Sequence, residues 1–100
     1  MATHLCLLGD ATSPHVQRWA REMRQRGYHV SLITARPASI DGVTVRALRP
    51  VRRSLDWLFR VRETRRHVAE LAPDLLHAHY VTSYGYLAAR CGTHPLVMTA

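Results

Sequence analysis

The stretch LCLLGDATSPHVQRWAREMRQRGYHVSLIT, residues 5–34, sets the architecture of this chain. It opens with a short apolar run that ends at Gly9, and it continues into a segment whose apolar residues recur at helical spacing. Gly27 ends that segment, and a second apolar run extends to Thr34. The order strand, turn, helix, strand predicts a βαβ unit, whose first turn and helix N-terminus face the ligand of such a domain.

The turn before the predicted helix contains residues that start helices. The hydroxyl of Ser13 is suited to accept hydrogen bonds from the first-turn amides, and Pro14 suits the first helical position, which needs no N–H. The first turn presents free N–H groups beside Gly9, where the backbone can approach a ligand closely, and this geometry binds phosphate. The face packed on the sheet is expected to consist of Val16, Trp19, Ala20 and Met23.

The remaining sequence alternates strands with helices. It predicts strands at residues 43–48, 74–79 and 96–99, the first of them near a sheet edge. A helix capped by Ser54 and ended by Pro73 is expected to carry an apolar stripe, and a shorter helix ends at Gly92. That stripe consists of Leu55, Leu58, Phe59, Val68, Leu71 and Ala72. We therefore expect a single Rossmann-like α/β domain over residues 1–100, an open parallel sheet with helices on both faces.

Ligands of such sheets bind beyond the carboxyl ends of the strands. For the first strand this edge holds the candidate substrate-binding residues Gly9, Asp10, Ser13 and His15. Asp10 and His15 flank the helix N-terminus, although either can also serve only as a turn or capping residue. Binding is favoured over catalysis for this loop.

Two histidines lie on one face of the strand at residues 74–79. His79 is nearer the ligand edge and can act as a hydrogen-bond donor or proton carrier, so it is the candidate catalytic residue. His77 is interpreted as a core histidine, and Tyr80, just past the strand, as a further substrate-binding residue. No third ligand has a spacing that demands a metal, and none is expected.

The formal net charge of +7 comes from 14 arginines, with no lysine, against seven acidic residues. Seven of these arginines fall between positions 49 and 66, close to Trp57 and Phe59. Basic and aromatic residues near a helix start can dock on an anionic lipid surface, although a solvated face that balances Asp56, Glu63 and Glu70 is the commoner outcome. The candidate anion-binding residues are Arg52, Arg53, Arg60 and Arg62. Nucleic acid is not expected, because base-reading and stacking motifs are absent.

Composition and motifs exclude several classes of protein. No apolar run approaches the roughly 18 residues of a membrane span, and no signal peptide is evident, so we expect a cytoplasmic protein. The two cysteines, Cys6 and Cys91, have neither disulfide nor metal-ligand spacing and are interpreted as packing residues. Neither G-x-G-x-x-G nor the P-loop motif occurs, which disfavours dinucleotide and P-loop domains. Receiver domains need paired acids after the first strand, where this chain has only Asp10.

Four segments together resemble the N-terminal domain of retaining glycosyltransferases of the GT-B fold, family 4 type. They are residues 13–19 (SPHVQRW), 26–34 (RGYHVSLIT), 73–79 (PDLLHAH) and 95–99 (PLVMT). The resemblance implies that this lobe binds the acceptor, while a second lobe, expected beyond Ala100, binds the nucleotide-sugar. It also implies a hexosyltransferase with no cofactor besides its donor substrate, and an envelope or lipid-linked acceptor. The isolated residues 1–100 are expected to be inactive.

The same resemblance assigns two parts of the site. His79 matches a histidine that lies beside the reacting sugar in that family, and the loop from Gly9 to His15 matches one that contacts the donor phosphates or the acceptor. Many members carry a glycine pair in this loop, where this chain has Gly9-Asp10-Ala11-Thr12. The alternatives are a sugar-nucleotide epimerase of the same fold and a non-catalytic module that binds anions or membranes. The expected location is the cytoplasm, with a peripheral position at the inner face of the membrane.

Overall fold

Within the residues described by the computed structural model (3–49, 56–79, 84, 87, 89–90 and 96–99), the chain forms one parallel sheet with a long helix on each side. In chain order its elements are β1 (His4–Leu8), α1 (Pro14–Gln25), β2 (His29–Thr34), β3 (Thr44–Ala47), α2 (Asp56–Leu71), β4 (Leu75–His79) and β5 (Leu96–Thr99). The predicted helix through Leu87 lies only partly inside the described residues.

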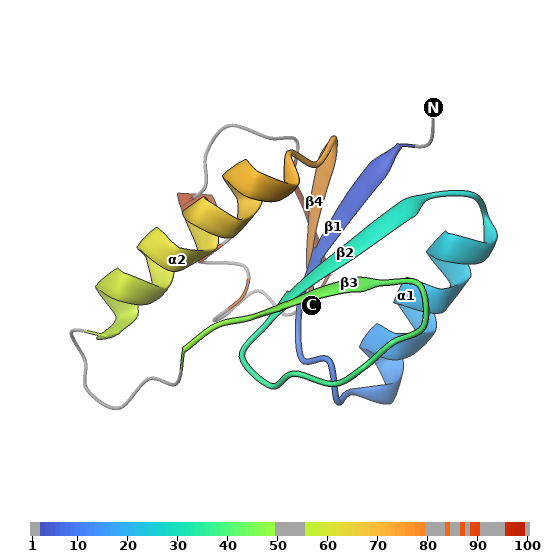
Figure 1. The fold of residues 1–100 in the computed structure, drawn as a ribbon, viewed down its shortest axis with the longest axis horizontal. Coiled ribbons are helices and arrows are strands. Elements are labelled where there is room, and N and C mark those ends of the chain that lie inside the picture. Colours follow the sequence, from blue (N-terminus) through green and yellow to red (C-terminus); the bar gives the residue numbers. More distant parts are fainter. Residues whose placement is uncertain are drawn as a thin grey trace.

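The strand order in the sheet is β3-β2-β1-β4-β5, and every pair is parallel. The chain runs outward from β1 to β3 and then returns through α2 to place β4 on the other side of β1 (Figure 1). Ligands of open α/β sheets bind at the carboxyl ends of the strands where the order reverses, which here is the junction of β1 and β4. The predicted parallel sheet is confirmed, and β3 lies at its edge as expected.

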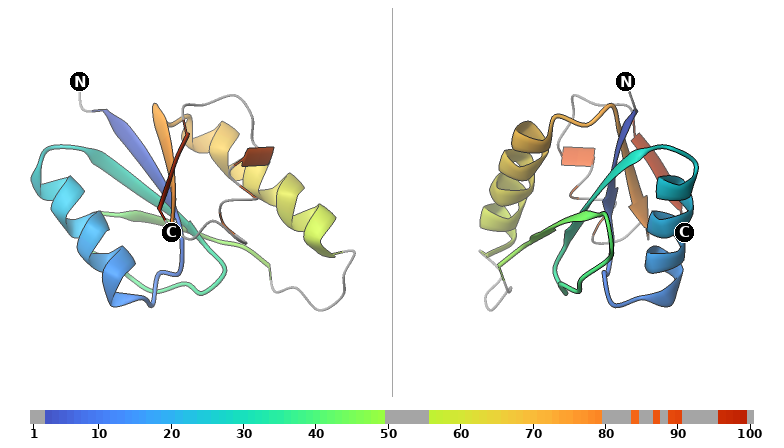
Figure 2. Two further views of the ribbon diagram at one scale, coloured as in Figure 1. Left: turned by 180° about the vertical axis from the view of Figure 1, so that it is seen from behind. Right: turned by 45° about the vertical axis from the view of Figure 1, so that its right-hand side comes forward.

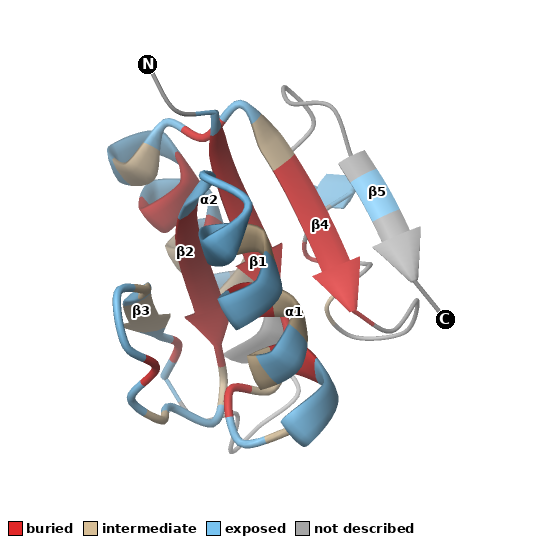
Figure 3. Cartoon of the chain, turned by 90° about the vertical axis from the view of Figure 1, so that its right-hand side faces the viewer, coloured by how far each residue is buried: buried red, intermediate tan, exposed pale blue. Residues whose placement is uncertain are grey.

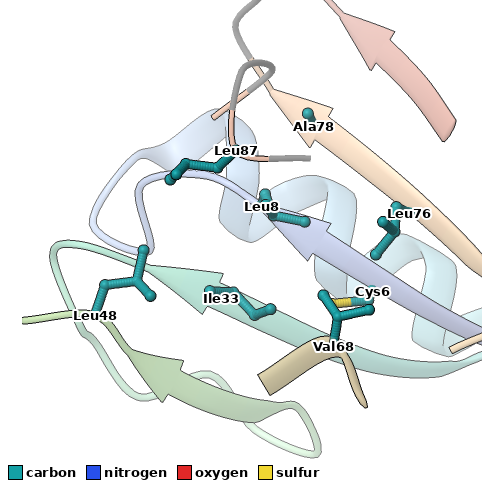
Figure 4. Close-up of a cluster of buried hydrophobic side chains, with 8 residues drawn as sticks. All are labelled: Cys6, Leu8, Ile33, Leu48, Val68, Leu76, Ala78 and Leu87. Carbon is teal, nitrogen blue, oxygen red and sulfur yellow. The ribbon is translucent and has the colours of Figure 1, made fainter. Parts of the chain in front are cut away.

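The two helices cover opposite faces of the sheet (Figure 2). Because side chains alternate along a strand, neighbouring residues of β1 enter different cores. Leu7 packs in the cluster that contains Ala20 of α1, whereas Leu8 packs in the cluster that contains Val68 of α2. All five residues of β1 are buried, as are most of β2 and β4 (Figure 3). The cluster on the α2 side consists of Cys6, Leu8, Ile33, Leu48, Val68, Leu76, Ala78 and Leu87 (Figure 4).

The start of α1 differs from the prediction in one respect. Pro14 occupies the first turn and Ser13 the N-cap position, but the Ser13 hydroxyl makes no capping hydrogen bond. The turn before the helix is held by Asp10 instead, whose backbone carbonyl accepts the N–H of Ser13 at 3.0 Å and whose Oδ1 accepts the N–H of Thr12 at 2.9 Å. The first-turn amides of α1 are therefore not capped by Ser13.

The end of α1 follows the prediction. Gly27 has a φ of +94°, in the left-handed region that glycine adopts readily. Its N–H donates to the carbonyl of Arg24 at 3.0 Å, and the N–H of Tyr28 donates to the carbonyl of Met23 at 3.1 Å. These two bonds form a Schellman motif, which satisfies the last carbonyls of the helix.

The predicted apolar stripe of the second helix is wrong at two positions. Phe59 is 63% exposed, because the residues that face the sheet from α2 are Val61, Val68 and Leu71, and a helix places Phe59 away from that line. Ala72 lies past the end of α2 with a φ of +47° and is exposed. Ser54 and Leu55 fall outside the described residues, as does the side chain of Leu58.

Acidic side chains of α2 connect it to β3 and to the segment that follows β3. Nη1 of Arg46 lies 3.1 Å from Oε2 of Glu70, and the backbone N–H of Arg49 donates to Oε1 of Glu63 at 2.8 Å. The guanidinium of Arg60 donates to the carbonyl of Arg49 at 2.8 Å. Arg49 and Arg60 of the arginine-rich segment therefore make contacts within the domain. This agrees with the interpretation that the segment is a solvated face whose positive charges are balanced by acidic residues.

Replacing Gly27 by alanine tests the left-handed end of α1. Because a Cβ is disfavoured at a φ of +94°, we expect Gly27→Ala to lower the free energy of unfolding by about 1–2 kcal/mol, measured by urea denaturation. Gln25→Ala, at an exposed helical position of the same turn, is the matched control and should change it by less than about 0.5 kcal/mol. Equal effects of the two substitutions would contradict this account of the helix end.

Candidate functional site

The candidate site lies where the carboxyl ends of β1 and β4 meet. Gly9 follows β1 directly, and its N–H donates to the carbonyl of Ile33 at 3.2 Å. A Cβ placed on Gly9 would lie 3.1 Å from Cγ2 of Val16 and 3.3 Å from Cβ of His79. The backbone after β1 therefore passes tightly between α1 and the end of β4, a close approach that favours glycine.

His79, the last residue of β4, is the central side chain of the site. It is 1% exposed, and neither of its ring nitrogens has a hydrogen-bond partner among the residues that the structure describes. Its ring stacks on that of His77, with centroids 4.6 Å apart and planes inclined by 17°. The prediction that His77 is buried in the core is confirmed, since it is 5% exposed.

The helix α1 brings two more rings to His79. His15 and Trp19 are four residues apart and so lie on the same face of the helix. The ring of His15 lies 5.5 Å from that of His79, and the ring of Trp19 lies 5.0 Å from His77 and 5.7 Å from His79, all edge to face. We call His15, Trp19, His77 and His79 the four-ring cluster. It runs from an exposed side chain, His15, to a fully buried one, His79.

Burial fixes the charge of the inner histidines. Burial, followed by the neighbouring imidazoles of His77 and His15, lowers the pKa of His79 from its ordinary value to about 4. The pKa of His77 is also lowered, chiefly by burial. His79 is therefore neutral at pH 7, with one ring nitrogen as a donor and the other as an acceptor.

The other predicted residues of the first loop have local partners. Oδ1 of Asp10 accepts hydrogen bonds from both the backbone N–H and the hydroxyl of Thr12, at 2.9 and 2.6 Å. Ser13 is half-buried at the N-cap of α1. The structure therefore brings Gly9, His15 and His79 together and places Asp10 and Ser13 in the adjoining turn. Tyr80 lies outside the described residues.

The candidate anion-binding arginines belong to a different surface. Arg60 and Arg62 lie on α2, which covers the face of the sheet opposite to α1 (Figure 2). Arg62 is exposed, whereas Arg60 is half-buried and donates to a backbone carbonyl. Arg52 and Arg53 lie outside the described residues.

Sequence reasoning placed Trp19 in the core and did not connect it to the histidines. The signal that could have found it is the spacing of four between His15 and Trp19, combined with a β4 strand beside β1. Among the described residues, no group of three or more His, Cys, Asp or Glu side chains could hold a metal ion. In the same part of the chain, neither helix has the length and apolar character needed to cross a membrane.

The parallel strands and the reversal of strand order at β1 and β4 define a Rossmann-like α/β domain, a fold whose ligands bind at this edge of the sheet. The sequence model of the family described as glycosyl transferase 4-like matches residues 4–100. The chain therefore belongs to the glycosyl transferase 4-like family. No relative was found among the curated proteins.

Solved structures agree on the fold. A glycosyltransferase from Rickettsia africae is similar to this chain with a TM-score of 0.72 and 12% identity, and the match covers 99% of this chain and 30% of that one. MurG from Acinetobacter baumannii is similar with a TM-score of 0.69 and 18% identity, over 96% of this chain and 33% of that one. This chain thus spans about a third of the length of each glycosyltransferase.

The same fold also occurs in a different protein. The C-terminal domain of a hydrogenase from Pyrococcus furiosus is similar with a TM-score of 0.60 and 14% identity, over 98% of this chain and 91% of that domain. At such identities the likeness concerns the fold, and the predicted N-terminal GT-B architecture is confirmed by the two glycosyltransferases together with the family match.

The lowered pKa of His79 makes a prediction about stability. Between pH 6.5 and pH 4 the unfolded chain binds a proton at this histidine and the folded chain does not, so stability falls as the pH falls through this window. We expect His79→Gln to remove this contribution, on the order of 3 kcal/mol between pH 7 and pH 4. Urea denaturation over a pH series measures it, with the wild type losing more stability than the variant. If the free energy of unfolding depended on pH equally in the wild type and in His79→Gln, the lowered pKa assigned to His79 would be refuted.

Proposed function

We propose that this chain forms the N-terminal lobe of a retaining glycosyltransferase, which transfers a hexose from a nucleotide-sugar to an acceptor in a cleft between two lobes. Membership of the glycosyl transferase 4-like family supports the reaction class. The likeness to two glycosyltransferases of which this chain spans about a third supports a second lobe that binds the nucleotide. The acceptor is an envelope or lipid-linked precursor, used at the cytoplasmic face of a membrane.

The observation that carries this proposal is the buried, unpartnered imidazole of His79 at the junction of β1 and β4. Buried polar groups are nearly always hydrogen-bonded, and both ring nitrogens of His79 lack partners in the described part of the chain. A sugar hydroxyl supplies both a donor and an acceptor, which matches what a neutral imidazole offers. His79 then contacts the reacting sugar and orients it in the cleft.

The loop and first helix turn beside His79 suit the phosphates of a nucleotide-sugar. The first turn of α1 contains no acidic residue, so its positive end is not neutralised by a side chain of that turn. Gly9 lets the backbone approach closely, and His15 extends from the same turn toward His79. We assign the loop from Gly9 to His15, with Asp10 and Ser13, to binding of the donor phosphates or the acceptor, and Tyr80 to a further substrate contact.

The test is transfer activity in the full-length protein with a panel of nucleotide-sugars. His79→Ala should lower kcat on the order of 100-fold, because it removes a preorganised hydrogen-bonding group at the reacting sugar. His29→Gln changes an exposed histidine at the start of β2, at the opposite end of the strands, and should leave kcat unchanged.

The reaction products distinguish the proposed retaining transferase from the alternative, a sugar-nucleotide epimerase. Transfer with the donor's anomeric configuration kept in the product supports a retaining transferase, whereas an epimerised donor with no transfer supports the sugar-nucleotide epimerase. An unaltered kcat in His79→Ala would overturn the role assigned to this histidine.

A second candidate function, contact with an anionic membrane, is favoured by the outer face of α2. Phe59 is 63% exposed, and the exposed Arg62 and Arg66 follow it three and seven residues later, on the same side of the helix. An aromatic side chain that enters the interface beside arginines that attract acidic headgroups is the arrangement expected of a membrane-surface helix. This contact would hold the protein near a lipid-linked acceptor.

Flotation with anionic vesicles tests this second function. We expect Phe59→Ser combined with Arg62→Gln to weaken binding to phosphatidylglycerol vesicles at least about fivefold, since one arginine near the surface contributes about 1 kcal/mol. Arg21→Gln, on the exposed face of α1, is the matched control and should bind as the wild type does. If the double variant floats as well as the control, α2 is not a membrane-contact surface.

A further inference from the structure

Trp19 is the large side chain of α1 that reaches both histidines of β4. Its half-buried indole meets the ring of His77 at 83° and the ring of His79 at 67°, with centroids 5.0 and 5.7 Å away. One indole therefore packs against two stacked imidazoles at once. Edge-to-face packing of this kind fixes the relative orientation of aromatic rings.

Packing alone orients His79 in the described part of the chain. Histidine rings in functional sites are usually held by a hydrogen bond from one ring nitrogen to a carbonyl or carboxylate, and His79 has no such bond. Its ring is instead bounded by His77 on β4 and by Trp19 and His15 on α1. Both ring nitrogens are therefore buried and without a hydrogen-bond partner among the described residues.

Besides burial, the neighbouring imidazoles of His77 and His15 also lower the pKa of His79. The titratable groups that act on it are His77 from β4 and His15 from α1, and both disfavour a positive charge. The carboxylate of Asp10, from the loop after β1, is hydrogen-bonded within its own turn. A protonated His79 would have no counter-ion among these groups, and the indole of Trp19 helps to exclude the water that would otherwise solvate the charge.

We propose that Trp19 is a positioning residue for His79: its indole packs against the imidazole at the junction of β1 and β4 and holds it in a fixed orientation. This inference rests on the proposed function, in which His79 meets the sugar. Trp19 itself does not touch the substrate and acts through His79. Its contribution is an imidazole ring held in one orientation by packing, with no hydrogen bond to the protein at either nitrogen in the described part of the chain.

The test is an NMR titration of the His79 ring in the chain of residues 1–100, which needs no substrate. In the wild type we expect the ring to titrate with a pKa of about 4, and in Trp19→Leu we expect the pKa to rise toward 6.5, because water reaches the ring. Trp19→Phe keeps an aromatic edge and should titrate closer to the wild type than Trp19→Leu does. Met23→Leu, at a half-buried position one turn further along α1, is the control and should titrate as the wild type does.

A wild-type ring that titrates at 6.5, or a Trp19→Leu ring that titrates as the wild type does, would overturn the proposal. Trp19→Phe is the milder change. A His79 pKa in this variant that lies between those of the wild type and Trp19→Leu would support the proposal. In the full-length enzyme, Trp19→Leu should lower kcat more than it raises KM for the donor. The NMR titration tests the role of Trp19 and needs no enzyme turnover. The kcat of His79→Ala tests the role of His79 in transfer. One proposal can therefore be overturned without the other.

Discussion

The pairing of β1 on both sides is the constraint on which the rest of the structure depends. β1 is buried throughout, so its backbone groups must find partners in β2 and β4 rather than in water. Parallel pairing on both sides requires α2 to carry the chain back across the sheet. That return places the end of β4 beside Gly9, and the junction at which His79 lies is therefore a consequence of how the central strand satisfies its hydrogen bonds.

Packing, with no hydrogen bond to either ring nitrogen, holds the His79 ring in the described part of the chain. A buried imidazole without a hydrogen bond destabilises a folded protein, and natural sequences accept such a cost mainly at functional positions. Here three rings, those of His15, Trp19 and His77, pack closely around the unpartnered imidazole of His79. The two ring nitrogens of His79 are thereby left without a partner in the described part of the chain, while the carboxylate of Asp10 is hydrogen-bonded within its own turn.

Sequence patterns predicted the fold well because its signals are local. The apolar run before Gly9, Pro14 at the start of α1 and Gly27 at its end each have one physical reason and appear as expected. Three details were wrong. A hydroxyl suited to capping does not have to cap, and the spacing of apolar residues on α2 did not reveal that Phe59 faces away or that Ala72 lies past the end of the helix. The meeting of His15 with His79 was foreseen from the strand ends. Trp19 was missed because helical periodicity indicates which face is buried, but not which strand that face covers.

The ion pair between Arg46 and Glu70 has a consequence for how separate copies of the chain behave. In the described sheet β3 is an outer strand, and an outer strand presents unpaired backbone groups to which a strand from another molecule can add. β3 has only four residues, and one of them carries a charge whose partner is fixed on α2 at 3.1 Å. An incoming strand would have to pack beside this charged pair and could gain few hydrogen bonds. Arg46 thus disfavours the addition of another strand at the β3 edge of the described sheet.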